Sequence, residues 1–163
     1  MRSEVKGNCN RAGKTIAIVI VSFFGLVFSI LISIPVVNNF TALNVEKILL
    51  KAPLPDDTEL CDSLHIAGKI TGNGNGMQFF GAMLIKSGLP IEALDKYYSE
   101  YREGGFDYLV EPQTSAEIST SIADHGGIVF SHLEKAENFD GFYIVYSWGR
   151  SNYFLSDWDL RGH

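Results

Sequence analysis

The chain has 163 residues and a formal charge of −6, and 46% of its residues are hydrophobic. Residues 1–14 carry four basic and one acidic side chain, a charge of +3, so the remainder carries −9. An acidic bulk excludes nucleic-acid binding by phosphate neutralisation and electrostatic attraction to an anionic membrane surface. The length after the N-terminal segments, about 125 residues, suits one domain with a single core.

Residues 15–37 form an uncharged apolar run that predicts one membrane-spanning helix. The run has 23 residues, of which 16 are Ile, Leu, Val or Phe. At about 1.5 Å per residue it reaches roughly 35 Å, more than the roughly 30 Å of a hydrocarbon core. A buried helix of a soluble protein is the alternative, but a helix in a soluble protein normally keeps a polar stripe, and this run is apolar all round. We therefore expect a lipid bilayer to be the partner of residues 15–37.

The flanking charges predict the orientation of this helix. Basic residues are concentrated before the apolar run, at Arg2, Lys6, Arg11 and Lys14. Basic flanks stay on the cytoplasmic side. We therefore expect a cytoplasmic tail at 1–14 and an extracytoplasmic C-terminal domain, in a single-pass protein of the cell membrane, with a bacterial plasma membrane as the preferred setting.

A cleaved signal peptide is the alternative to this signal anchor. Its apolar region is shorter, about 7–15 residues, and it ends in a small-x-small cleavage site. The end of the run here, Ser33-Ile34-Pro35-Val36-Val37-Asn38-Asn39, has no such site. The sequence favours an uncleaved anchor.

Small residues recur on one face of the apolar helix. Ser22, Gly25, Ser29 and Ser33 are spaced three, four and four residues apart. Small residues let two membrane helices approach closely. The spacing indicates a contact with a second copy of the chain or with another membrane protein, and a chance alignment of common residues is the alternative.

The two cysteines, Cys9 and Cys61, lie on opposite sides of the membrane in this topology. They cannot pair with each other, so no intrachain disulfide is expected. We interpret Cys61 as a buried small hydrophobe, and an intermolecular bridge is the alternative.

Residues 38–60 are interpreted as a stalk before a domain at 61–163. The apolar spacing in the stalk predicts a short helix over 42–51, which Pro53 and Pro55 end. In the domain, two Asn-Gly pairs at 73–76 separate apolar runs and predict a β-hairpin over 63–86. A glycine-rich anion-binding loop is the alternative, but the Lys-Ser/Thr of a P-loop is missing.

The rest of the domain combines one helix with short strands. Pro90 near its start, early acidic residues and Gly104-Gly105 at its end predict a helix over 89–102, with Ile91, Leu94, Tyr98 and Tyr101 on its buried face. Strands are expected at 106–111, 128–133, 142–148 and 153–155. The apolar spacing at 115–123 fits a helix or a strand, and we favour the helix. The fold class is therefore α+β, an N-terminal transmembrane helix followed by a small, mostly antiparallel sheet with one main packed helix.

No catalytic, cofactor-binding or metal-binding residues are assigned from the sequence. The histidines, His65, His125, His132 and His163, show no zinc-ligand spacing. Asp124-His125 is the most site-like pair, because a carboxylate can orient an imidazole. Strand alternation places Phe142, Tyr146 and Trp148 on one face, which either binds a ligand or closes the core.

Type IV pilins also combine a short basic leader, a long apolar helix and an α+β domain. This chain lacks the acidic residue expected early in that helix, and Gly13-Lys14-Thr15 is a poor processing site. The resemblance is therefore set aside.

Three functional hypotheses remain. The first is a membrane-anchored interaction or accessory module that presents an acidic domain outside the cytoplasm. The second is an extracytoplasmic enzyme whose site is not recognisable in the sequence. The third is a small-molecule sensor that uses the face of Tyr146 and Trp148.

Overall fold

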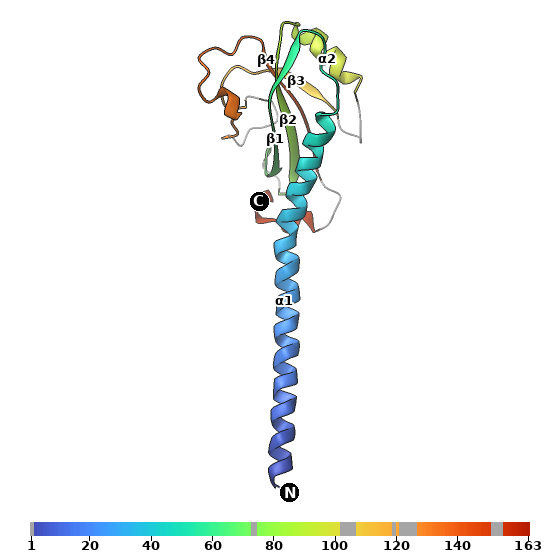
Figure 1. The fold of residues 1–163 in the computed structure, drawn as a ribbon, viewed down its shortest axis with the longest axis vertical. Coiled ribbons are helices and arrows are strands. Elements are labelled where there is room, and N and C mark those ends of the chain that lie inside the picture. Colours follow the sequence, from blue (N-terminus) through green and yellow to red (C-terminus); the bar gives the residue numbers. More distant parts are fainter. Residues whose placement is uncertain (1, 73–74, 102–106, 119, 121–126, 151–154) are drawn as a thin grey trace.

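The structure is a computed structural model (Figure 1). It describes all residues except 1, 73–74, 102–106, 119, 121–126 and 151–154, and the side chains from residue 13 onwards. The elements are α1 (Arg2–Leu49), β1 (Thr58–Gly68), β2 (Gln78–Ser87), α2 (Ile91–Ser99), β3 (Leu109–Pro112), η1 (Ser131–Leu133), β4 (Phe142–Arg150), η2 (Ser156–Trp158) and η3 (Leu160–Gly162).

The four strands form one antiparallel sheet in the order β1-β2-β4-β3. On one face, α1 and α2 contribute Leu49, Leu94 and Tyr98 to a cluster with side chains of β2, β3 and β4. On the other face, the connection between β3 and β4 covers the sheet with Ile118, Phe130 and Leu133. The domain is therefore an α+β fold, as predicted, with both helices on the same face.

Strand β2 is covered on both sides, and its sequence reflects this. Every residue from Gln78 to Ser87 is buried except Lys86. A strand with two covered faces is an apolar run rather than an alternating one, which explains Phe79-Phe80-Gly81-Ala82-Met83-Leu84-Ile85. The predicted hairpin is confirmed, because β1 and β2 pair from Thr58 opposite Ser87 to Gly68 opposite Gln78.

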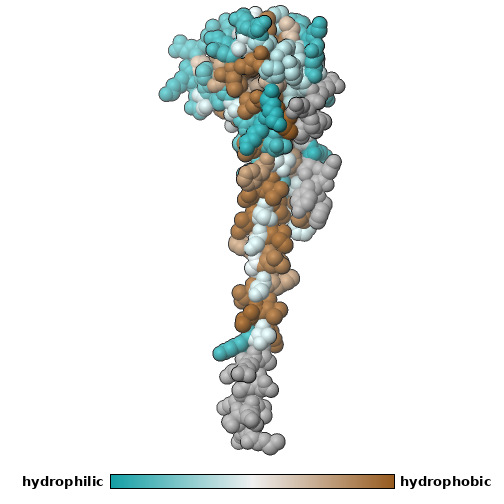
Figure 2. Space-filling model, turned by 45° about the vertical axis from the view of Figure 1, so that its right-hand side comes forward, coloured by the Kyte–Doolittle hydropathy of each residue, from teal (hydrophilic) through white to brown (hydrophobic). Residues whose placement is uncertain are grey.

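Helix α1 is continuous but has two environments. Its side chains from 13 to 33 are exposed, and the space-filling view shows a largely apolar stem below a polar domain (Figure 2). From Ile34 onwards, every third or fourth side chain is buried, and the series is Ile34, Asn38, Ala42, Val45 and Leu49. The second part of α1 therefore packs on the sheet, mainly against β1 and β2.

The region expected as a stalk with its own helix is arranged differently. Residues 38–49 are the last turns of α1, and Pro35 lies inside α1 without ending it. The prediction of a separate helix over 42–51 is therefore corrected to the end of a longer helix. The helix ends at Leu49, before Pro53, and the chain enters β1 at Thr58.

Two further predictions are wrong in the described residues. Residues 128–133 form no regular strand: Val129 makes one isolated bridge with Glu117, and Ser131–Leu133 is η1. The bridge also excludes a helix at 115–118, and most of 119–126 lies outside the described residues.

The other predicted elements are present with shifted ends or are not tested. The helix predicted over 89–102 is α2, which ends at Ser99; Gly104-Gly105 lies outside the described residues. The strand predicted over 106–111 is β3, and the one over 142–148 is β4. Of the strand predicted over 153–155, only Leu155 is described, in a turn.

Helix α1 approaches the sheet closely at Gly81 in β2. A Cβ added there would lie 2.5 Å from the backbone nitrogen of Glu46 and 2.9 Å from its Cα. These are backbone atoms of a helix, which cannot yield as the end of a side chain can. A glycine at this position therefore lets α1 lie directly on the hairpin.

We predict that Gly81→Ala destabilises the full-length protein in detergent by about 1–3 kcal/mol, because α1 must move away from the sheet. Thermal unfolding followed by circular dichroism measures the effect. Gly68→Ala is the matched control, since it is also a strand glycine but its added Cβ meets only Arg161 O, at 3.5 Å. Equal losses from both substitutions would contradict the prediction.

Candidate functional site

The main polar cluster lies where α1 crosses β1. Glu46 is on the buried side of α1, and strand alternation turns Ser63 and His65 of β1 toward it. The Ser63 hydroxyl donates to Glu46 Oε1 at 2.6 Å, and His65 Nδ1 lies 2.6 Å from Glu46 Oε2. The Glu46 side chain is 10% exposed and that of His65 is 36% exposed.

The short contact selects one tautomer of His65 when Glu46 is ionised. An ionised carboxylate only accepts hydrogen bonds, so the tautomer that makes this contact has its N–H at Nδ1 and donates a hydrogen bond to Glu46. A carboxylate that orients an imidazole in this way is one half of an acid–base pair. However, Ser63 donates to the carboxylate and not to the imidazole, so its hydroxyl is not activated as a nucleophile.

A small hollow lies beside His65. It has a volume of about 240 Å³ and is lined by Val36, Asn39, Phe40, Leu43 and His65. Four of its five lining residues come from α1: Val36 lies at the end of the apolar run, and the other three follow it. The cluster can therefore offer one oriented imidazole to a largely apolar contact surface.

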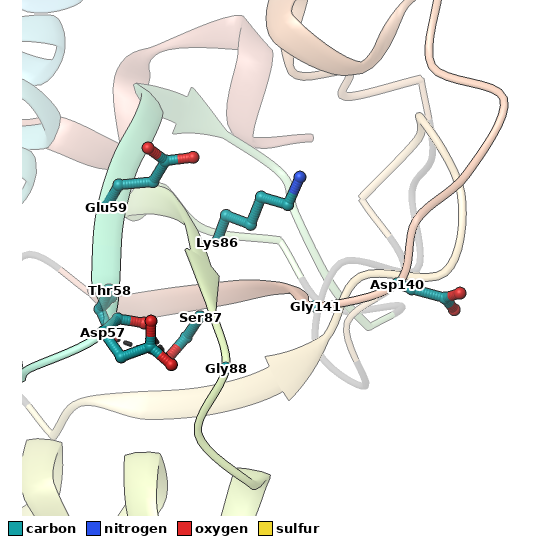
Figure 3. A pocket seen from close by; sticks show the side chains of 8 residues that line it. All are labelled: Asp57, Thr58, Glu59, Lys86, Ser87, Gly88, Asp140 and Gly141. Carbon is teal, nitrogen blue, oxygen red and sulfur yellow. Dashed lines mark hydrogen bonds between the residues drawn. The ribbon is translucent and has the colours of Figure 1, made fainter.

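A larger, open hollow of about 650 Å³ lies where β1 begins, β2 ends and the chain enters β4 (Figure 3). It is lined by Asp57, Thr58, Glu59, Lys86, Ser87, Gly88, Asp140 and Gly141. The Thr58 and Ser87 hydroxyls are 2.7 Å apart, and Ser87 also donates to Asp57 O at 3.2 Å. These bonds join the ends of β1 and β2.

The charges of this open hollow do not converge on one point. The Asp140 carboxylate points away from Asp57 and Ser87 (Figure 3), and the Lys86 ammonium lies 5.1 Å from the centre of the Phe142 ring. Among the described residues, no group of three or more His, Cys, Asp or Glu side chains is placed to hold a metal ion. The hollow is therefore a polar surface feature and not a built ligand site.

A third polar cluster, which we call the C-terminal clamp, joins the chain end to α1. It consists of Asn38, Asn39, Asp159 and Arg161. Asn38 Nδ2 donates to Asp159 Oδ2 at 3.0 Å, and Arg161 donates to Asn39 Oδ1 at 2.8 Å and to the Pro35 carbonyl at 3.2 Å. Arg161 and Asp159 are themselves paired at 2.7 Å.

The clamp changes the acidity of Asp159. The hydrogen bond from the Arg161 side chain, with a further one from Asn38, lowers the pKa of Asp159 to about 2 despite its partial burial. A carboxyl with a depressed pKa stabilises the folded state fully above its unfolded pKa, about 4, and loses that contribution as the pH falls toward 2.

We predict that Asp159→Asn lowers the unfolding temperature at pH 7, because it removes the charge that Arg161 pairs with. The difference between variant and wild type should then shrink between about pH 4 and pH 2, where wild-type Asp159 becomes protonated. Thermal unfolding of both proteins in detergent at stepped pH measures this. A difference that stays constant to pH 2 would contradict it.

The histidines considered at the sequence level, other than His65, have partners outside the Glu46 cluster where they are described. Asp124 and His125 are outside the described residues. The backbone N–H of His132 donates to Asp62 at 3.0 Å, and His163 Nε2 lies 2.9 Å from Asp157 O. Cys61 is only half-buried, and burial together with Glu59 raises the pKa of its thiol.

The aromatic face is mostly core. Tyr146 is fully buried, its ring centre is 5.5 Å from that of Phe80, and its hydroxyl donates to Glu111. Phe142 belongs to the same buried cluster, whereas Trp148 is partly exposed. The core-closing interpretation of Tyr146 is therefore the one that the packing supports.

Sequence reasoning missed the Glu46 cluster. Its signal is present: Glu46 follows Val45 and shares the helical spacing of Ala42 and Leu49, so it falls near a buried face. Its partners are 17 and 19 residues away in another element, and spacing in the sequence cannot pair them.

No family model, curated protein or solved structure matches this chain. Function is therefore argued from the geometry of the chain itself.

Proposed function

We propose that this chain is a single-pass, membrane-anchored protein that presents a small acidic domain outside the cytoplasm as an interaction or accessory module. One observation carries the proposal: a single helix has exposed apolar side chains over its first part and is a core element of the domain over its second part. An exposed apolar surface of this extent in a monomer marks a membrane or protein contact.

The continuity of α1 supports a positioning role. A flexible linker would let a domain swing freely, but here the helix enters the domain with only Pro35 inside it. A rotation or tilt of the spanning segment is therefore transmitted directly to β1 and β2. Such coupling suits a module whose orientation depends on its partner in the membrane.

The other two hypotheses have narrower support. In the described residues, the acid–base pair that an extracytoplasmic enzyme could use is Glu46–His65, and Ser63 beside it is not activated. Asp124 and His125 lie outside the described residues. A sensor that uses Tyr146 and Trp148 would need a cavity at that face, and Tyr146 is packed in the core.

The proposed topology predicts which cysteines an impermeant maleimide labels in intact cells. With Cys61 replaced by Ser, native Cys9 should be labelled only after permeabilisation. A second variant, with both native cysteines replaced and Ser99→Cys at an exposed position of α2, should be labelled without permeabilisation. Labelling of Cys9 in intact cells, or protection of residue 99, would contradict the topology.

Recovery of the full-length protein in the membrane pellet after carbonate washing is the companion measurement. A protein released by carbonate, or a mature N-terminus near Asn38, would overturn the uncleaved anchor itself.

The partner of the anchor is proposed to be a second copy of the chain or another membrane protein, bound through Ser22, Gly25, Ser29 and Ser33. All four are exposed, and the hydroxyls of Ser29 and Ser33 donate to the carbonyls of Gly25 and Ile30. At 3.6 residues per turn, this stripe lies on the side of α1 roughly opposite the side that packs on the sheet. The domain therefore leaves the stripe open.

We predict that Gly25→Leu with Ser29→Leu lowers self-association in a membrane dimerisation assay about tenfold or more, because the two backbones can no longer approach closely. Val27→Leu with Leu31→Ile, on the other side of the helix, is the matched control and should have little effect. If the stripe variant associates as strongly as wild type, the stripe is not the contact.

A further inference from the structure

The end of the domain from which α1 projects is formed by the C-terminal segment. Figure 1 shows η2 and η3 beside α1 at this end, near the C-terminus. The C-terminal clamp holds them there through the bonds of Asp159 and Arg161 to Pro35, Asn38 and Asn39. We call residues 156–162 the C-terminal foot.

The clamp places the foot at a defined depth. The apolar run 15–37 is centred on residue 26. Half of a hydrocarbon core of roughly 30 Å corresponds to about ten residues of helix, so the outer boundary falls near residue 36. Pro35 and Asn39, the residues that Arg161 contacts, lie on either side of this boundary.

The foot exposes two large apolar side chains at this level. Trp158 is 61% exposed and Leu160 is 86% exposed, compared with 45% for Leu60, the next most exposed large hydrophobic residue described after α1. Between and beside them, Ser156, Asp159 and Gly162 are buried. Asp157 and Arg161, the other two polar residues of the foot, are exposed. The segment therefore turns Ser156 and Asp159 toward the protein and its two large apolar side chains outward, beside these two charged groups.

Both carboxylates of the foot have partners within the protein, which reduces the cost of placing them beside lipid. Asp159 is paired with Arg161, and Asp157 Oδ1 accepts the backbone N–H of Met77 at 2.9 Å. Trp side chains favour the membrane–water interface, where the ring is partly desolvated and its N–H stays hydrated.

We propose that the foot is a second membrane contact, with Trp158 and Leu160 inserted among the headgroups of the outer leaflet beside α1. The inference rests on the proposed membrane anchor. Because the domain as a whole is acidic, the lipid it fits is a zwitterionic or neutral one. Two contacts, the helix and the foot, fix the tilt of the domain on the membrane.

The test uses the full-length protein with Trp148→Phe. The sequence has two tryptophans, so Trp158 is then the single fluorescent tryptophan. The protein is reconstituted in phosphatidylcholine vesicles whose acyl chains carry bromine either near the headgroups or near the bilayer centre. We expect Trp158 fluorescence to be quenched roughly twofold or more by the shallow bromines, less by the deep ones, and to be protected from acrylamide, as for a residue of the interfacial aromatic belt.

Two variants complete the test. Leu160→Asp should reduce the bromine quenching of Trp158 while leaving thermal stability unchanged, because residue 160 is exposed. A reporter at Tyr97→Trp on α2, with both native tryptophans replaced by Phe, should show no bromine quenching, because α2 lies at the far end of the domain (Figure 1).

The outcomes distinguish a failure of the membrane anchor from a failure of the lipid contact proposed for the foot. If the protein does not float with the vesicles, the membrane anchor fails and the foot fails with it. If it floats but acrylamide quenches Trp158 and bromine does not, the anchor stands and the foot is wrong. Blue-shifted emission without bromine quenching would mean that protein covers Trp158, which also overturns the lipid contact.

Discussion

The packing of α1 on the β1–β2 hairpin is the contact on which the rest of the structure depends. Ala42 and Val45 form one cluster with Ala67, Met77 and Phe79, and Gly81 lets the helix backbone meet the strand directly. Small side chains at such a crossing bring helix and sheet close together and bury more of each. Without this contact, α1 would be an apolar helix attached to an unrelated domain, and with it both belong to one body.

Apolar packing alone would not determine the rotation of α1, because an apolar contact has little directionality. Two polar clusters supply directional bonds on either side of the contact. Glu46 bonds to Ser63 and His65 within the domain, and Asn38 bonds to Asp159 at the end of the domain from which α1 projects. A carboxylate left buried without these partners would be costly. We therefore interpret both clusters as devices that favour one register of the helix on the sheet.

Much of the fold could be predicted from periodicity, and the exceptions share a cause. The apolar run, the hairpin, α2 and β4 are visible because their patterns are local. The continuity of α1 was missed because the apolar run ends at Val37 and polar Asn38 follows it. Asn38 is polar because it contacts Asp159, 121 residues later in the chain, and no local pattern can show such a partner.

The prediction of a strand over 128–133 was wrong for a related reason. Ile128, Val129 and Phe130 form an apolar run with a strand-like composition, but here the run covers a sheet face instead of joining the sheet. Phe130 and Leu133 are fully buried in the cluster under β2 and β4. Composition reports burial, and it does not report whether the backbone bonds to a neighbouring strand.

The geometry also connects the Glu46–His65 pair to the proposed partner contact. Val36, Phe40 and Leu43, which line the hollow beside His65, continue the spacing of Ser22, Gly25, Ser29 and Ser33 along α1. A helix packed on that stripe and extending past the membrane would cover the hollow and meet the exposed edge of His65. The His65 imidazole would then lie at the border of the contact, where a hydrogen bond between His65 and the partner could favour one partner over another. If the proposed contact forms, the polar cluster takes part in association and need not be catalytic.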